Sequence, residues 1–376
     1  MSEAIEPAPS TPEEDGWEEL LKVVDRIPFV SGLKRDVARL GRLVVRRRAP
    51  RIAVLGAQGS GRSQLANALL GVPVLAVGPP TQGSSTQGRW VEIDAGGRRL
   101  DWLELDVGPK TEDAFHAAGR TPDLLVLVVT PEEVEQGLGL HLEAATALRS
   151  AQPDLPLVSV LTQIDTLEPS TAAAPYPTEK EIAVDAARKG LAQQLREASL
   201  PKTHFAIATS SPSEQRLAIE PVGIEALAEA LAAALPEAAR VEGARALVDA
   251  RKARRRVGTD VVRSCSSLAV TVAITPLPLS DIAVLAPLQG MMVTTLAYLS
   301  GRGWDTKTAG EWIASVGVVG SAGLGLRWGA QQIVKLVPGM GSIASAGIAG
   351  AGTLALGRSA LRYFLQDELE PEDAAG

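Results

Sequence analysis

The stretch RIAVLGAQGSGRSQLANALLG, residues 51–71, decides the fold of this chain. It begins with a short apolar run that ends in glycine, RIAVLG, and it closes with SQLANALLG, a segment of helical periodicity. A glycine-rich turn stands between the two. This order predicts a buried strand, a tight turn and a helix, which is the setting that a phosphate-binding loop requires.

The turn reads GAQGSGRS, residues 56–63, and fits the pattern G-x-x-x-x-G-K-[ST] except that Arg62 stands where lysine is expected. Glycines let successive backbone N–H groups face a phosphate at a helix N-terminus, and Ser63 would reach a magnesium ion. Arginine preserves the charge, but its planar fork does not guarantee the geometry of a compact ammonium. The predicted phosphate-binding residues are Gly56, Gln58, Gly59, Ser60, Gly61, Arg62, Ser63 and Gln64.

Several strand-like runs follow the loop. RWVEID and RRLDWLEL, separated by AGG, predict an antiparallel hairpin. DLLVLVV, LPLVSVL and HFAIAT are nearly continuous apolar runs separated by helical stretches, a pattern typical of buried parallel strands. We therefore predict an α/β domain over residues 49–235, with a mostly parallel sheet and one antiparallel hairpin strand.

Together with NALLG at residues 67–71 and the hairpin before Asp106, the loop makes residues 51–235 resemble the Era-like branch of the translation-factor-related GTPases. The resemblance implies a P-loop G domain that binds GTP or GDP with Mg²⁺. The family's switch threonine best matches Thr86 in GSSTQG, with Thr81 as the alternative. Its D-x-x-G motif falls on DVGP, so Asp106 is expected to hold magnesium through water.

Two further motifs of that family read guanine. N-K-x-D becomes TQID, in which Asp165 can accept both N1–H and N2–H of the base, whereas Gln163 lacks the lysine stem that covers it. The loop after the last strand corresponds to ATSS, where a backbone N–H near Ser210 would meet guanine O6. The resemblance thus implies guanine-binding residues Thr162, Gln163, Asp165 and Ser210, and magnesium-binding residues Ser63, Thr86 and Asp106.

Departures from the family pattern bear on catalysis. Pro109 occupies the glycine position of D-x-x-G and has no N–H to offer the γ-phosphate; Gly108 could substitute only if the loop shifts. Lys110 stands where a water-orienting glutamine would follow. We expect slow or partner-assisted GTP hydrolysis and assign no catalytic residue. A pseudo-GTPase that binds no nucleotide is the alternative, and it is favoured by Arg62, Pro109 and Gln163. A third possibility is an ATP-binding enzyme, and the retained Asp165 argues against it.

Composition changes on both sides of the predicted G domain. Residues 1–15 are acidic and predicted to be a disordered tail, and residues 365–376 form a second acidic tail. Residues 16–48 include a basic amphipathic helix, which would contact anionic lipid or pack on the next domain. Residues 236–263 are predicted to form a basic helical connector.

Residues 264–364 are predicted to be an all-α, hydrophobic domain of helical hairpins. From Ser264 to Ser300 the only charge is Asp281, and the later apolar stretches are rich in glycine. Such a pattern fits marginal spanning of, or hairpin insertion into, a lipid bilayer. Its small-residue faces would also allow a homo-oligomer to form. A soluble, tightly packed helical bundle is the alternative.

The same region, from PLPLSD at residue 276 to Phe364, resembles the YcjF-type domain of unknown activity found behind bacterial Era-like G domains. The resemblance implies association with the bacterial inner membrane. The basic run Arg251 to Arg256 supports a cytoplasmic G domain by the positive-inside rule. We therefore expect a membrane-anchored GTP-binding switch or scaffold with a protein partner that the sequence does not identify.

Charge and composition exclude other classes of function. The net charge of −7 argues against general nucleic-acid binding, and the single cysteine, Cys265, excludes a disulfide framework. The three histidines lack the spacing of metal ligands, and the first residues lack the features of a signal peptide.

Overall fold

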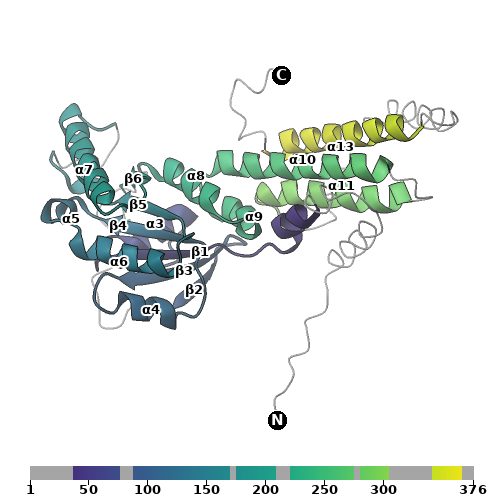
Figure 1. The fold of residues 1–376 in the computed structure, drawn as a ribbon. Coiled ribbons are helices and arrows are strands. Elements are labelled where there is room, and N and C mark those ends of the chain that lie inside the picture. The colour runs from purple at the N-terminus through teal and green to yellow at the C-terminus, as the bar shows by residue number, and fades with distance from the viewer. Residues whose placement is uncertain are drawn as a thin grey trace, which may run out of the picture. The chain divides into compact units, whose positions relative to one another are not determined.

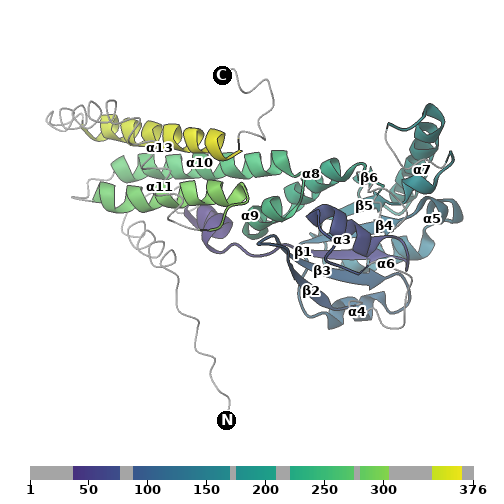
Figure 2. The ribbon, with the colours of Figure 1, turned by 180° about the vertical axis from the view of Figure 1, so that it is seen from behind.

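The computed structural model describes residues 37–76, 88–169, 175–208, 221–274, 280–304 and 341–365. The chain divides into two compact units. One, here called the sheet unit, is Arg48–Ala253, and the other, the helical unit, combines Met1–Arg47 with Arg254–Gly376. Figures 1 and 2 show the ribbon from opposite sides.

The sheet unit is built on six strands in the order β2-β3-β1-β4-β5-β6. Neighbouring strands run parallel, except that β2 and β3 form the predicted antiparallel hairpin. In the middle of the sheet, Leu55 of β1 faces Leu105 of β3 and Leu127 of β4. The predicted sheet is thereby confirmed. The strands are β1 (Arg51–Gly56), β2 (Trp90–Asp94), β3 (Arg99–Asp106), β4 (Leu124–Val129), β5 (Leu157–Leu161) and β6 (His204–Ala206).

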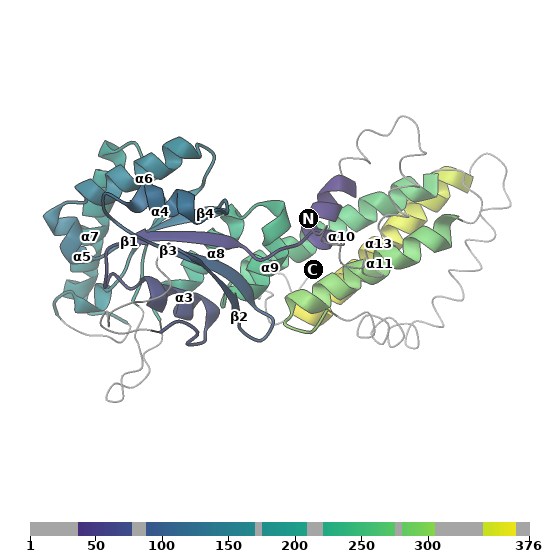
Figure 3. The same ribbon diagram turned by 90° about the horizontal axis from the view of Figure 1, so that it is seen from below.

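Helices cover both faces of the sheet because its central strands are apolar on both sides. All six residues of β4 are buried, as are all five of β5. In Figure 3, α4 and α6 lie on one side of the strands and α3 on the other. The elements are α3 (Arg62–Leu70), α4 (Thr111–Ala117), α5 (Pro131–Gln136), α6 (Gly139–Ala151), η2 (Ile164–Thr166), α7 (Thr178–Glu197), α8 (Ile224–Ala234) and α9 (Glu237–Ala246).

The sheet unit extends past Leu235, where sequence analysis ended the α/β domain. The physical reason lies in the contacts of α9 and the turn after it. Glu242 is fully buried and pairs with Arg99 of β3 at 2.7 Å. The backbone N–H of Val248 donates to the carbonyl of Leu69 in α3 at 2.7 Å. These contacts fasten the predicted connector to the sheet unit.

The helical unit contains a short helix at residues 37–45, which ends in the wider turn η1 (Gly41–Val45). Its apolar face, Val37, Leu40 and Val44, is buried in the protein. Arg39 on the same helix pairs with Asp260 at 3.4 Å. The helix thus makes a contact within the helical unit, which is neither the lipid nor the next domain considered in the sequence analysis. The long helices are α10 (Arg251–Ile274), α11 (Ser280–Leu299) and α13 (Gly341–Leu365).

Helices α10, α11 and α13 run side by side in Figures 1 and 2. The described parts of the C-terminal region are thus helical, as predicted. Within residues 37–76, 88–169, 175–208, 221–274, 280–304 and 341–365, no helix combines the length and the apolar character needed to cross a membrane.

Glycines bring the helices of this unit close together. A Cβ added at Gly350 would lie 2.2 Å from Cγ2 of Val270 in α10. A Cβ added at Gly357 would lie 2.6 Å from Cγ1 of Val262 in α10 and 3.0 Å from Sδ of Met292 in α11. Both glycines lie in the glycine-rich region that was predicted to pack in lipid or between copies, and here they pack helices of one chain.

Replacing Gly357 with alanine is expected to destabilise the helical unit by about 1–3 kcal/mol, because the added methyl group overpacks the contact with Val262 and Met292. The measurement is the thermal unfolding midpoint of the full chain. Gly290 of α11 is the matched control, since a Cβ there meets no atom within 4 Å. Gly290→Ala should leave the midpoint unchanged or raise it, because alanine is favoured over glycine in a helix by about 1 kcal/mol. Equal effects of both substitutions would contradict the packing argument.

Candidate nucleotide-binding site

The glycine-rich loop lies at the carboxyl end of β1, between β3 and β4. The strands that follow β1 in the chain lie on opposite sides of it, β3 on one side and β4 on the other. Open α/β sheets bind ligands at such a point, where the strand order reverses. Gly59 and Gly61 have φ angles of 85° and 94°, in the left-handed region that favours glycine. A Cβ on Gly56 would approach the carbonyl oxygen of Val128 to 2.7 Å. The predicted glycines are therefore required by the loop's own backbone.

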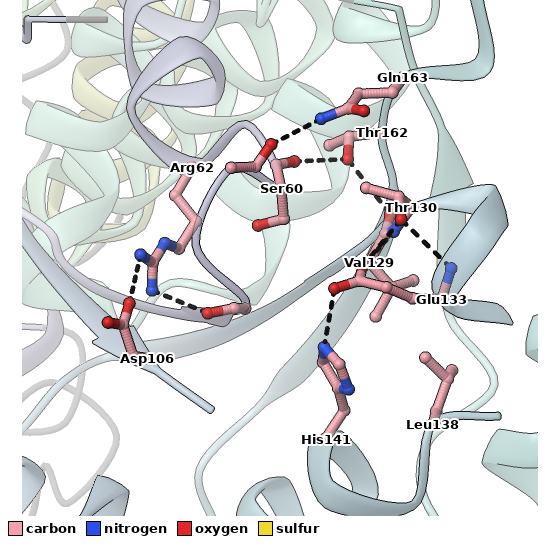
Figure 4. Close-up of polar contacts among 12 residues, drawn as sticks. Ser60, Arg62, Asp106, Val129, Thr130, Glu133, Leu138, His141, Thr162 and Gln163 are labelled. Atoms are coloured by element: carbon pink, nitrogen blue, oxygen red, sulfur yellow. Dashed lines mark hydrogen bonds and ion pairs between the residues drawn. The ribbon is translucent and has the colours of Figure 1, made fainter. Parts of the chain in front are cut away.

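Ser60 stands inside this loop and is only 2% exposed. Its Oγ is buried and has no hydrogen-bond partner among the described residues. A buried hydroxyl without a partner is costly, and such groups mark places where a ligand or water completes the hydrogen bonding. Figure 4 shows Ser60 between Arg62 on one side and Thr162 on the other. The other predicted loop residues lie nearby: Gln58 is exposed, and Gln64 is partly exposed in the first turn of α3.

The loop after β5 is tied directly to the phosphate loop. Thr162 Oγ1 donates to the carbonyl of Ser60 at 2.7 Å, and Gln163 Nε2 donates to the carbonyl of Gly59 at 2.7 Å (Figure 4). Asp165 follows in η2, and its side chain is partly exposed. Two motifs that sequence analysis found about a hundred residues apart are thus brought together.

Lys180 of α7 holds the far side of the β5 loop. It is fully buried, and its Nζ donates to the carbonyls of Asp165, Leu167 and Pro169 at 2.8, 3.1 and 3.4 Å. Burial lowers the pKa of Lys180, while the charges of Asp165 and Glu168 oppose that shift. This lysine fixes the backbone that carries Asp165.

Arg62 extends from the start of α3 to the ends of β1 and β3. Its Nη1 donates to the carbonyl oxygens of Gly56 at 2.8 Å and Leu105 at 2.6 Å. Its Nη2 forms an ion pair with Asp106 (Figure 4), and the arginine side chain is only 10% exposed. The arginine that replaces the expected lysine is therefore paired with the carboxylate that was predicted to hold magnesium.

Ser63, the second predicted magnesium residue, is directed at strand β3. Its Oγ donates to Oε1 of Glu104 at 2.8 Å, and Nε1 of Trp102 donates to the same oxygen at 3.2 Å. Glu104 is buried, at 6% exposure. Within the described part of the chain, no group of three or more histidine, cysteine, aspartate and glutamate side chains is arranged to hold a metal ion.

The DVGP turn is closed by Thr111, the first residue of α4. Thr111 Oγ1 accepts from the N–H of Gly108 at 2.9 Å and lies 2.6 Å from the carbonyl of Asp106. The Gly108 N–H, which sequence analysis considered for the γ-phosphate, is thus engaged within the turn.

A capping box supports the carboxyl end of β4 beside the site. Thr130 and Glu133 exchange hydrogen bonds at the start of α5, and His141 Nε2 lies 3.3 Å from Glu133 Oε1 (Figure 4). Burial favours the neutral acid, but hydrogen bonds from His141 and Thr130 hold the pKa of Glu133 below its ordinary value. The capping box anchors Thr130. The carbonyl of the preceding residue, Val129, accepts a hydrogen bond from the backbone N–H of Thr162 at 2.9 Å.

Three predicted residues, Thr81, Thr86 and Ser210, lie outside the described residues. Three others were missed. Glu104 precedes Asp106 by two positions and so shares its face of the strand, a signal that alternation along β3 offers. Lys180 and Thr111 carry no comparable signal, because their partners are set by the folded positions of α7 and the DVGP turn.

Sheet order, the antiparallel β2–β3 pair and a glycine-rich loop between β1 and α3 define the sheet unit as a G-domain fold of the P-loop type. This class is established by the strand topology and the loop together.

Comparisons with known proteins give one family model and one curated relative. A family model described as a domain of unknown function, DUF697, matches residues 240–375. Magnetosome membrane protein 22 of Magnetospirillum gryphiswaldense is 32% identical over 118 residues, which is 30% of this chain and 59% of the relative. The chain therefore spans 59% of the length of that curated relative.

Solved structures of G proteins are among those that the comparison found. Toc33 from Arabidopsis thaliana, in complex with Mg²⁺ and GMPPNP, has 17% identity and a TM-score of 0.34, covering 52% of this chain and 83% of its own. Era in complex with MgGDPNP and ribosomal RNA nucleotides has 14% identity and a TM-score of 0.35, covering 59% and 68%.

Proposed function

We propose that this chain is a guanine-nucleotide-binding protein of the Era-like class, which acts as a switch or scaffold at the cytoplasmic face of a bacterial inner membrane. One observation carries the nucleotide half of the proposal. The TQID loop donates two side-chain hydrogen bonds, from Thr162 and Gln163, to the backbone of the phosphate loop. The loop proposed to bind phosphate and the loop that carries Asp165 are thereby held next to each other.

The chemistry of such a site is recognition. Backbone N–H groups of the loop and the first turn of α3 face the phosphates, and Asp165 accepts from the two donors on the guanine edge. GTP hydrolysis is slow or partner-assisted, because Lys110 and Pro109 stand at positions that orient water and the γ-phosphate in the family pattern.

The membrane half of the proposal rests on the C-terminal region. The relative in Magnetospirillum is named a membrane protein. In the helical unit, Arg47 lies over the ring of Trp304 at 3.5 Å and Arg302 lies 4.7 Å from the ring of Phe364. Tryptophan is enriched at membrane–water interfaces, where an arginine beside it can extend its charge toward water. A YcjF-type role for residues 264–364 is part of this proposal, as are a further protein partner and a homo-oligomer.

A pseudo-GTPase is the second candidate function. It is favoured by the contacts of Arg62, whose guanidinium already has three acceptors within the protein: Gly56 O, Leu105 O and Asp106. A loop that binds its own arginine in this way could retain the fold and the β5 contacts without a ligand.

Isothermal titration of the purified full chain with GTP, GDP and ATP distinguishes the two functions. Binding of guanine nucleotides in preference to ATP is expected. Asp165→Asn should weaken GDP binding by about 1.5–3 kcal/mol, because a charged acceptor of two base hydrogen bonds is lost. Asp154, in the turn before β5, provides the control substitution Asp154→Asn, which should leave the affinity unchanged. Absence of binding to wild-type protein at millimolar nucleotide would establish the pseudo-GTPase instead.

A further inference from the structure

We propose that the guanidinium of Arg62 takes the place of the magnesium ion in this site, so that guanine nucleotide binds without a divalent cation. The inference rests on the proposed function, since it concerns how the same site neutralises phosphate charge. It departs from the magnesium set of Ser63, Thr86 and Asp106 that the family resemblance implies.

Asp106 supplies the first argument. A carboxylate that holds magnesium through water must direct its negative charge at the hydrated ion. Here that charge is paired with Arg62 in a direct contact, and the arginine side chain is 10% exposed. A magnesium ion entering this position would meet a fixed positive charge instead of a carboxylate, which opposes its binding.

The anchoring of Arg62 supplies the second argument. Its Nη1 is held by two backbone carbonyls, Gly56 O on β1 and Leu105 O on β3. A guanidinium has five N–H donors, and these two bonds with the Asp106 pair use three of them. Two donors and the full charge can still be directed at phosphate oxygens. Lysine could not do this, because an ammonium has only three donors.

The contacts of Ser63 are consistent with a site without magnesium, but they do not by themselves require one. A serine hydroxyl that donates to a carboxylate still has lone pairs for a metal. Its acceptor, however, is the buried Glu104, which also accepts from Trp102. The hydroxyl is thereby held against β3 in a small hydrogen-bonded group that is complete without an ion.

Ser60 indicates that a ligand belongs in the loop even though the magnesium residues are engaged. Its Oγ is buried, belongs to a residue 2% exposed, and has no partner within the described residues. It stands 2.8 Å from the position of a Cβ on Gly56, so the two ends of the turn approach each other closely at this hydroxyl. The loop that carries Arg62 therefore has an unfilled hydrogen-bonding position.

The test is titration of the purified full chain with fluorescently labelled GDP, in excess MgCl₂ and in excess EDTA. The expected dissociation constants differ by less than about threefold, equivalent to about 0.65 kcal/mol. A larger loss of affinity in EDTA would overturn the inference while leaving the proposed function standing. No binding in either buffer would overturn the proposed function, and the inference with it.

Arg62→Lys provides the contrasting variant, because lysine retains the charge but cannot hold both carbonyls and Asp106 while reaching phosphate. Its GDP affinity should become dependent on magnesium, with a loss of about tenfold or more in EDTA. Its circular dichroism spectrum and unfolding midpoint establish that it is folded. A folded Arg62→Lys protein that binds GDP as well in EDTA as wild type does would contradict the role assigned to the guanidinium.

Discussion

Replacing Arg48 with methionine is expected to lower the free energy of unfolding of the sheet unit by about 3 kcal/mol, because it leaves a buried carboxylate without its countercharge. Nη1 and Nη2 of Arg48 each donate to Asp123 at 2.6 Å, and the Asp123 side chain is only 6% exposed. The backbone N–H of Arg51 adds a third bond to that carboxylate at 2.9 Å. The pair joins the residues that precede β1 to the residue that precedes β4.

Urea unfolding of the full chain measures this effect, and a double variant isolates its cause. Methionine keeps an apolar stem of similar length, so packing changes little. Combining Arg48→Met with Asp123→Asn removes the buried charge as well as its partner. The double variant should therefore be more stable than Arg48→Met alone. A double variant that is less stable would show that the loss arises from packing rather than from the unpaired carboxylate.

Replacing Lys180 with methionine is expected to destabilise the loop that carries Asp165, by about 2–4 kcal/mol in the free energy of unfolding. The substitution removes a fully buried ammonium and the three carbonyl contacts that it makes between residues 165 and 169. Because Asp165 loses its backbone support, GDP affinity should fall with stability. Urea unfolding and hydrogen exchange of residues 163–169 measure the two consequences.

Lys189 offers a matched control on the same helix. Its side chain is 78% exposed and pairs with Asp185 one turn away, so Lys189→Met removes the same charge without removing a buried contact. This control should leave unfolding, hydrogen exchange and GDP affinity unchanged. A similar loss in both variants would mean that the charge of α7, and not the three carbonyl contacts, supports the loop.

Local sequence was sufficient for the framework of the sheet unit. The segments that form β1, β4 and β5 are nearly continuous apolar runs, which predicts strands buried on both faces. AGG between two alternating runs predicts a hairpin. The amphipathic helix predicted within residues 16–48 is likewise present at residues 37–45, where Val37, Leu40 and Val44 are buried. These features depend on neighbours a few positions away, which a sequence displays directly.

The C-terminal boundary of the sheet unit was harder to predict from the sequence. Helix α9 was predicted to be part of a basic connector because the chain becomes strongly basic just after it, at residues 251–256. In the fold, Glu242 is buried against Arg99, and the N–H of Val248 bonds to Leu69. Those partners come from strands and helices more than a hundred residues earlier, so no local pattern announces them.

The sequence by itself determined that a glycine-rich turn joins a strand to a helix at residues 56–63, and that the TQID motif follows a buried strand. Only the tertiary structure decided which hydrogen bonds and ion pairs Arg62, Ser63 and Asp106 form, because these contacts join two elements, α3 and β3. Arg62 meets a carbonyl and a carboxylate at the end of β3, and Ser63 meets Glu104 of the same strand. Hydrogen-bond partners are chosen by distance in space, and strand β3 is brought beside β1 only by folding.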